Sequence, residues 1–261
     1  MNARLQDSLL EFRNQHYSKF VKDIEKNGRK NEYSDGMSFT ELDEWRTTTL
    51  SKTLHQRYKD TGILWLEKTE LAKLMEWKLA RGKFRATLEK LIQSNDPDSV
   101  KSFTDAAFQV LVDWTKSRSD ASEPFPIVVR KAMDHACKLR GVGPATATLI
   151  LSLSGPALRM SDLGAHDVPF FSDEVFEILN PSYGKIKYTA KEYIDLVLSK
   201  MAVFDAAKLQ NVEEALWCLR KTEKIGKPSK SVEKLLDELR RTIALAPSEE
   251  KPSVKRRKIQ S

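Results

Sequence analysis

The chain has 261 residues, of which 40% are hydrophobic and 31% charged, a composition typical of globular proteins. We find no apolar run of bilayer length and no basic-then-apolar signal at the N-terminus, so we expect neither a membrane span nor secretion. Cys137 and Cys218 are too few for an iron–sulfur cluster or a zinc site, and we expect both to be reduced and buried.

The net charge of +7 is unevenly distributed along the chain. The last eleven residues contain five lysines and arginines and no acidic residue, which leaves +2 for the rest of the chain. The high isoelectric point is therefore mostly a property of the tail. Any nucleic-acid-binding surface on the body must be a local basic patch.

Helical periodicity runs through almost the whole body, with apolar residues three and four positions apart. The first such segment covers residues 5–24 and is followed by a polar connection at 27–36. Ser38 and Glu41 have the spacing of a capping box, which predicts a helix from there through Leu54. Further helices are predicted at residues 66–79, 83–93, 97–115, 126–139, 172–179, 189–204, 212–225 and 229–245.

No segment shows a convincing alternating pattern of a strand, so we predict an all-α fold, a helical bundle, with one domain at residues 1–245. The pattern leaves open whether this domain has one lobe or two. Residues 246–261 are polar and contain prolines, and we predict that they are disordered.

Two predicted helices flank the string L139-R-G-V-G-P-A-T-A147. Gly141 and Gly143 permit positive φ, and Pro144 suits the first position of a helix. We expect the backbone amides near Gly141, Gly143 and Ala145 to point outward at a helix N-terminus, where an anion such as a DNA phosphate binds. The alternative interpretation is a plain turn whose small residues let two helices pack closely.

This string resembles the helix-hairpin-helix motif, in the form found in the DNA glycosylase superfamily of base-excision repair. The resemblance covers about residues 131–153 and extends more weakly to Leu179. It implies a DNA glycosylase-like helical fold and a hairpin that grips duplex phosphate, often with a monovalent cation bound at its backbone. No other metal and no cofactor are expected. The hairpin residues implicated in DNA binding are Gly141, Val142, Gly143, Ala145 and Thr146.

The resemblance also bears on catalysis. Bifunctional members of the family carry a nucleophilic lysine at the position of Ala145, so Schiff-base lyase activity at the hairpin is excluded. Monofunctional members retain an aspartate at the start of a later helix, and Asp173, after the candidate cap Ser172, has the best context. Asp162 and Asp167 lie nearer the usual spacing. Acids also favour the first turn of any helix, so catalysis stays open.

His166, beside Asp167, is either a general base or a surface residue of a loop.

A second conspicuous string is M75-E-W-K-L-A-R-G-K-F-R-A86, in which four basic residues occur without an intervening acid. We predict that Gly82 ends a helix there and that the cations form a phosphate-contacting patch. Trp77 is a candidate for stacking on a base or wedging into the duplex. The alternative is that the aromatic residues are core and the cations are solvated. The four basic residues are Lys78, Arg81, Lys83 and Arg85.

The tail carries Lys255, Arg256, Arg257 and Lys258, which we interpret as a nuclear localisation signal read by an import receptor, or as a nonspecific DNA-binding arm. Taken together, these features predict a nuclear DNA-binding protein, also compatible with the cytosol, with a role in DNA repair. One alternative is a monofunctional glycosylase that uses Asp173. Another is a protein-interaction module that kept the fold and lost DNA binding, with partners that the sequence does not name.

Overall fold

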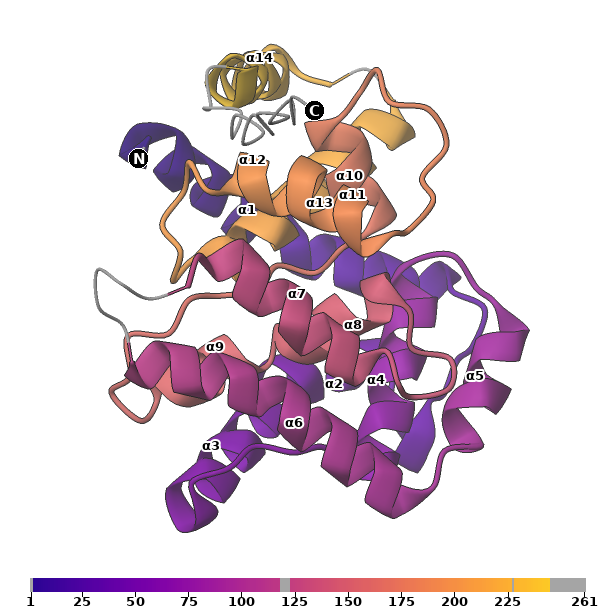
Figure 1. Cartoon of the computed structure of the whole chain (residues 1–261). Helices are drawn as coiled ribbons and strands as arrows, with labels where there is room; N and C mark the ends of the chain where they lie inside the picture. Colours follow the sequence, from indigo (N-terminus) through magenta and orange to yellow (C-terminus); the bar gives the residue numbers. More distant parts are fainter. Residues whose placement is uncertain (1, 118–122, 227, 245–261) are drawn as a thin grey trace, which may run out of the picture.

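The computed structural model describes residues 2–117, 123–226 and 228–244 (Figure 1). Within them all regular secondary structure is helical, which confirms the predicted all-α class. The α-helices are α1 (Ala3–Asn27), α2 (Phe39–Glu44), α3 (Leu50–Thr61), α4 (Lys68–Arg81), α5 (Ala86–Gln93), α6 (Pro97–Lys116), α7 (Phe125–Ala136), α8 (Pro144–Leu151), α9 (Ser154–Arg159), α10 (Asp173–Leu179), α11 (Ala190–Tyr193), α12 (Ser199–Met201), α13 (Leu209–Ile225) and α14 (Lys230–Ala244).

Three short elements complete the chain order: a 3-10 turn η1 (Ser34–Gly36) and two π-helical turns, η2 (Trp45–Thr49) and η3 (Ile194–Leu198). The turn η2 joins α2 to α3, and η3 joins α11 to α12. The helices predicted through Leu54 and at residues 189–204 are therefore each continuous through a π-helical turn. In the described part of the chain, no helix is long and apolar enough to cross a bilayer.

Local sequence signals set several helix boundaries. The Ser38 side chain accepts a hydrogen bond from the Glu41 amide while Glu41 reaches back to the cap, which confirms the predicted capping box. Gly82 ends α4, as predicted. Ser172 caps α10 by accepting from the Val175 amide. These signals act within one helical turn, so they do not depend on the rest of the fold.

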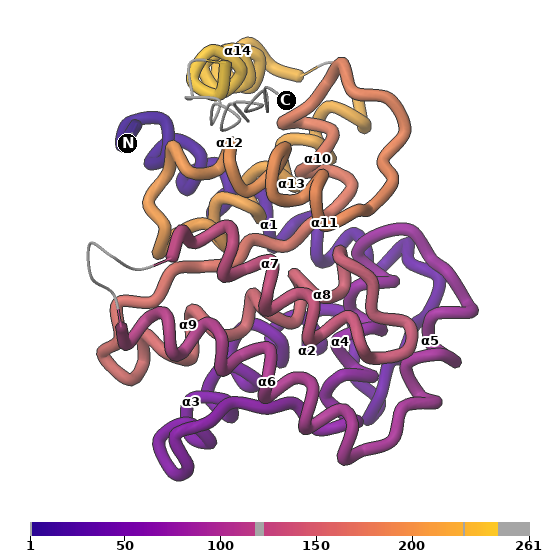
Figure 2. Tube along the Cα trace, viewed as in Figure 1, coloured from indigo at the N-terminus to yellow at the C-terminus, as the bar shows by residue number. Residues whose placement is uncertain are grey.

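The helices form two groups, shown most clearly by the trace in Figure 2. The N-terminal helix α1 packs along α13 and against α14, so both ends of the chain contribute to one group together with α10, α11 and α12. The second group contains α2 to α9, in which α6 lies along α7 and α3 against α9. We call these two groups of helices the first and second lobe, and the hairpin belongs to the second.

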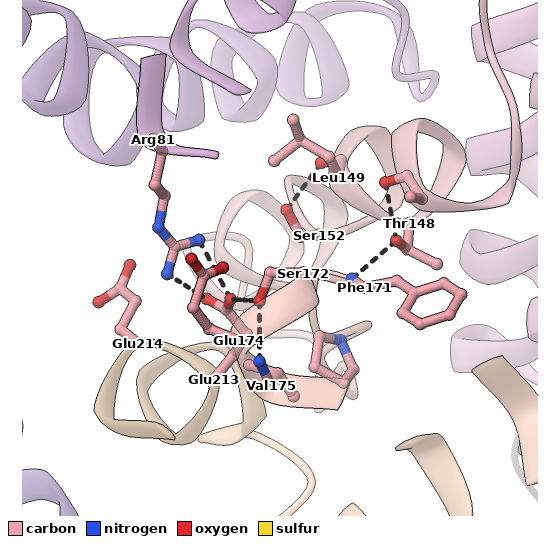
Figure 3. A network of polar contacts seen from close by, with 12 residues as sticks. Arg81, Thr148, Leu149, Ser152, Phe171, Ser172, Glu174, Val175, Glu213 and Glu214 are labelled. Carbon is pink, nitrogen blue, oxygen red and sulfur yellow. Dashed lines mark hydrogen bonds and ion pairs between the residues drawn. The ribbon is translucent and has the colours of Figure 1, made fainter. Parts of the chain in front are cut away.

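A buried ionic network joins the two lobes (Figure 3). The Arg81 guanidinium of α4 donates to both carboxylate oxygens of Glu213 on α13, each at 3.1 Å. The neighbouring Glu214 accepts from Arg46 at 3.0 Å and from Arg13 at 2.7 Å. Burial lowers the Arg81 pKa, but Glu213, Tyr17 and Glu214 together outweigh this effect, so the Arg81 pKa is raised.

Both cysteines are free thiols, as expected. Cys218 is buried and Cys137 is half-buried, so the expectation of burial is met in full only by Cys218. Burial raises the pKa of Cys137 to about 11 and that of Cys218 to about 12, which keeps both protonated and unreactive at neutral pH.

Candidate nucleic-acid interface

The string Leu139–Ala147 connects α7 to α8, and its last residues begin α8 as the sequence predicts. The chain leaves α7 after Ala136 and enters α8 at Pro144, the first helical residue. Gly141 has a φ of +79°, whereas Gly143 is extended, with a φ of −99° and a ψ of −178°. Only the first glycine therefore uses the positive-φ region that we expected to be open to both.

Three amides of the hairpin have no acceptor within the described residues, namely those of Gly141, Gly143 and Ala145. The other two amides of this segment are satisfied: Val142 donates to the Leu139 carbonyl at 3.1 Å, and Thr146 donates to the Gly143 carbonyl at 2.9 Å. Pro144 has no amide hydrogen. The unpaired amides are the three that the sequence analysis named as an anion site.

The two glycines meet different surroundings. A Cβ on Gly141 would lie 2.9 Å from the Leu91 Cβ and 3.3 Å from the Ile92 amide nitrogen, so α5 approaches the hairpin too closely for a side chain. No atom lies within 4 Å of a Cβ on Gly143. Gly141 is therefore required by the fold, whereas the space above Gly143 is open to a ligand.

Asn95, at the junction of α5 and α6, holds the hairpin in place. Its side-chain amide donates to the Arg140 carbonyl at 2.9 Å, and its carbonyl accepts from the Arg140 amide at 2.8 Å. The same side chain also donates to the Ile92 carbonyl at 2.9 Å. Sequence reasoning missed this residue because a single asparagine 45 positions before its partner carries no local signal.

The hairpin also has backbone oxygens suited to a monovalent cation. The carbonyls of Leu139, Arg140 and Gly143 accept hydrogen bonds from within the protein. Those of Gly141 and Val142 accept none within the described residues. Backbone oxygens are the type of ligand that hard cations take, so these two carbonyls are the candidates for the monovalent-cation site that the resemblance implies.

The four basic residues of the predicted patch at 78–85 do not form one exposed surface. Lys83 and Arg85 are exposed on the connection between α4 and α5. Arg81 is 3% exposed and engaged by Glu213, so it is not available to a phosphate. Trp77 is fully buried and donates to Asp43 at 2.7 Å, which makes it a core residue and neither a stacking platform nor a wedge.

Lys78 is half-buried and points to the hairpin. Its Nζ donates to Thr146 Oγ1 on the first turn of α8 at 2.9 Å. Burial, reinforced by the nearby positive charge of Arg85, lowers the Lys78 pKa to about 8, although Asp173 acts in the opposite direction. The structure therefore brings together the hairpin, one cation of the basic string and the candidate catalytic aspartate.

Asp173 is the first residue of α10, as predicted. Its Oδ1 accepts from the Tyr188 hydroxyl at 2.9 Å, and burial together with this bond raises the Tyr188 pKa to about 12. Thr148 of α8 accepts from the Phe171 amide at 3.0 Å, which ties the segment before Asp173 to the hairpin helix (Figure 3). Asp173 and Arg85 line a cavity of about 530 Å³.

The remaining candidates, Asp167, Asp162 and His166, are engaged in contacts or turns of the fold itself. Asp167 is 1% exposed, and its carboxylate accepts from Arg159 at 2.7 Å and from the Gln210 amide at 3.2 Å. Burial raises the Asp167 pKa to about 6 although Arg159 opposes the shift. Asp162 adopts a positive φ of 58° in a turn. The ring of His166 lies edge-on against Trp114, with ring centroids 4.9 Å apart.

No protein-family model, curated protein or solved structure matches this chain. The predicted nuclear localisation signal, Lys255 to Lys258, lies outside the described residues.

Proposed function

We propose that this protein binds duplex DNA and holds one backbone phosphate at the hairpin amides of Gly141, Gly143 and Ala145. The observation that carries the proposal is that these amides lack acceptors in the described chain and that the space at Gly143 is open. A phosphate oxygen at the start of α8 would satisfy these donors and meet the positive end of the helix dipole.

The exposed Lys83 and Arg85 add positive charge on the connection after α4, and Arg85 lies close enough to Lys78, which contacts α8, to lower the Lys78 pKa. Contacts of this kind recognise the phosphate backbone and carry no base information. The binding is therefore sequence-independent and weakens as salt rises. With the basic tail and the resemblance of the hairpin, this points to a nuclear role in DNA repair.

The test is duplex binding by the wild type and by Gly143→Glu at two salt concentrations. The new carboxylate fits the open space but repels the phosphate, so we expect affinity to fall about tenfold or more. Gly226→Glu is the matched control, because it adds the same charge at another open position and should bind as the wild type does. Equal, weak binding by the wild type and Gly143→Glu would contradict the proposal and favour a protein-interaction module.

A second candidate function is a monofunctional DNA glycosylase in which Asp173 stabilises the developing positive charge on the sugar. It is favoured by the position of Asp173 on the wall of a cavity and by its bond to Tyr188. We expect release of a free base from at least one duplex in a panel carrying alkylated, deaminated or mismatched bases, and none from Asp173→Asn. A panel that yields no base, despite binding, leaves a non-catalytic DNA-binding protein.

A further inference from the structure

The cavity beside Asp173 is built from both lobes. Its walls come from the connection between α4 and α5, from α10 and the loop that follows it, and from α13 and α14. In Figure 1 this loop runs between α10 and α11 at the upper right, above α5. A volume of about 530 Å³ lies within the range of small-ligand sites.

The charges on the walls do not cancel. Five lining residues are basic and three are acidic, a net charge of +2. Glu177 and Glu223 are both engaged by Arg220, at 2.8 and 3.1 Å, and Glu223 also by Arg240 at 3.4 Å. The two arginines and the two glutamates neutralise one another, so they add no net charge to the cavity.

The excess positive charge comes from Lys83, Arg85 and Lys185. Within the described chain none of the three has a carboxylate at ion-pair distance. The remaining acid, Asp173, accepts from Tyr188. The Arg85 guanidinium lies 5.2 Å from the centre of the Tyr188 ring, so the arginine is held at the cavity wall.

This charge balance selects the class of ligand. A phosphate diester inside a DNA strand carries one negative charge, whereas a phosphate monoester carries about −1.5 to −2 at pH 7 and offers three strong acceptor oxygens. A net charge of +2 is matched by the monoester. The aromatic side chains of Tyr183 and Tyr188 on the same walls provide apolar surface for a nucleoside attached to it.

We propose that this cavity binds a phosphate monoester, held by Lys83, Arg85 and Lys185, such as the terminal phosphate of a nucleotide. The same chemistry can come from a free nucleoside monophosphate or from the 5′-phosphorylated end of a DNA strand. This site is separate from the hairpin amides and does not depend on them.

The experiment measures calorimetric binding of adenosine 5′-monophosphate, inorganic phosphate and adenosine to the full chain. We expect the monophosphate to bind, inorganic phosphate to bind more weakly and adenosine not to bind. Lys185→Met should lower the affinity for the monophosphate at least about fivefold, because it removes one of the charges without a partner. Lys187→Met is the matched control: it lies on the same loop, is exposed and does not line the cavity, so it should change nothing.

A second arm separates the two sources of the phosphate. Duplexes with 5′-phosphate and 5′-hydroxyl ends are compared in the wild type and Lys185→Met. If the wild type prefers the duplex with 5′-phosphate ends and Lys185→Met removes this preference, the strand end is the ligand. If the wild type shows no preference but still binds the monophosphate, the ligand is a free nucleotide.

The inference is overturned if neither the monophosphate nor the phosphorylated end binds better than its unphosphorylated counterpart, or if Lys185→Met and Lys187→Met behave alike. Gly143→Glu separates the two proposals. It should lower duplex affinity about tenfold or more while leaving monophosphate binding unchanged, since the cavity does not include the hairpin.

Discussion

At the scale of single residues, the hairpin uses two glycines for opposite reasons. Gly141 lies at positive φ against α5, so the protein itself requires a residue without a side chain there. Gly143 has an ordinary extended conformation and open space, so nothing inside the protein requires glycine. A close approach of a ligand is a reason for glycine at this position.

We therefore expect Gly141→Ala to lower the free energy of unfolding by about 1–3 kcal/mol, because it adds backbone strain and a contact with Leu91. Gly143→Ala should change stability by less than about 0.5 kcal/mol. Urea denaturation of both variants checks this. Equal losses in the two variants would contradict the different roles assigned to the glycines.

The lowered Lys78 pKa predicts that the proposed DNA binding at the hairpin depends on pH. A bound phosphate favours the protonated amine, so binding takes up a proton at and above the free pKa of about 8. Below pH 7 Lys78 is protonated with or without DNA, so we expect its contribution to duplex affinity to be nearly constant there. Between pH 7 and 9.5 we expect duplex affinity to fall about tenfold. Lys78→Met should bind more weakly at pH 7 and lose this dependence.

The control for this measurement is Lys200→Met. Lys200 is also half-buried with a lowered pKa, but it donates to the Leu179 carbonyl and to Asn180, away from the hairpin. This variant should keep the wild-type pH profile at constant ionic strength. Indistinguishable profiles for the wild type and Lys78→Met would show that Lys78 does not sense the bound phosphate.

At the scale of elements, the position of the hairpin depends on a side chain outside it. Asn95 bridges the α5–α6 junction to the backbone of Arg140, directly before Gly141, whose amide is the first without an acceptor in the described chain. On the other side, Thr148 ties α8 to the segment that leads into α10. The hairpin is thereby hydrogen-bonded to neighbouring segments on both sides.

We expect Asn95→Ala to cost about 1–3 kcal/mol of stability, since it leaves backbone groups of Arg140 without their partners. Duplex affinity should fall as well, because the amides lose their fixed orientation. Asn27→Ala, which removes an exposed bond to Asp23, should alter neither property. Thermal denaturation and filter binding on the two variants measure these effects. If Asn95→Ala is destabilised but keeps the wild-type duplex affinity, the orientation that Asn95 gives the hairpin is not needed for binding.

At the scale of the whole molecule, the two lobes are joined through charged groups that are almost completely buried. Arg81 and Arg46 reach from the second lobe to Glu213 and Glu214 of α13. Ser172 donates to Glu213 at 3.0 Å, so the cap of α10 belongs to the same network. The network thus sets the position of Asp173, and with it one wall of the cavity, relative to α4.

Removing one member of this network should be far more damaging than removing an exposed ion pair. We expect Arg81→Met to lower the free energy of unfolding by about 3–5 kcal/mol, because Glu213 stays buried without its countercharge. Arg220→Met, whose partners are partly exposed, should cost about 1 kcal/mol or less. The double variant Arg81→Met with Glu213→Leu should lose less than the two single losses added together, as measured by urea denaturation.

The sequence predicted most of what depends on neighbouring residues. The all-α class, the caps at Ser38 and Ser172, the turn at Gly82 and the entry to α8 at Pro144 all follow from interactions within a helical turn. The free amides of Gly143 and Ala145 follow in the same way, because a helix N-terminus cannot satisfy its own donors.

The basic string at 78–85 shows the limit of this reasoning. Residues 77 and 81 are four positions apart on α4, so Trp77 and Arg81 share the face that turns to the core, whereas Lys83 and Arg85 follow the helix end and stay in solvent. Counting charges along the chain does not separate these groups. Their separation depends on which face of α4 meets α13.

By itself, the sequence determined the helices, their caps and a hairpin built to present backbone amides, because these are properties of short segments. Only the tertiary structure decided that Arg81 is an internal ion-pair partner, that Lys78 contacts the hairpin and that Asp173 shares a cavity with Lys185. Each of these contacts joins residues far apart in the chain, and the free energy of burying charge is defined only when the surrounding atoms are in place.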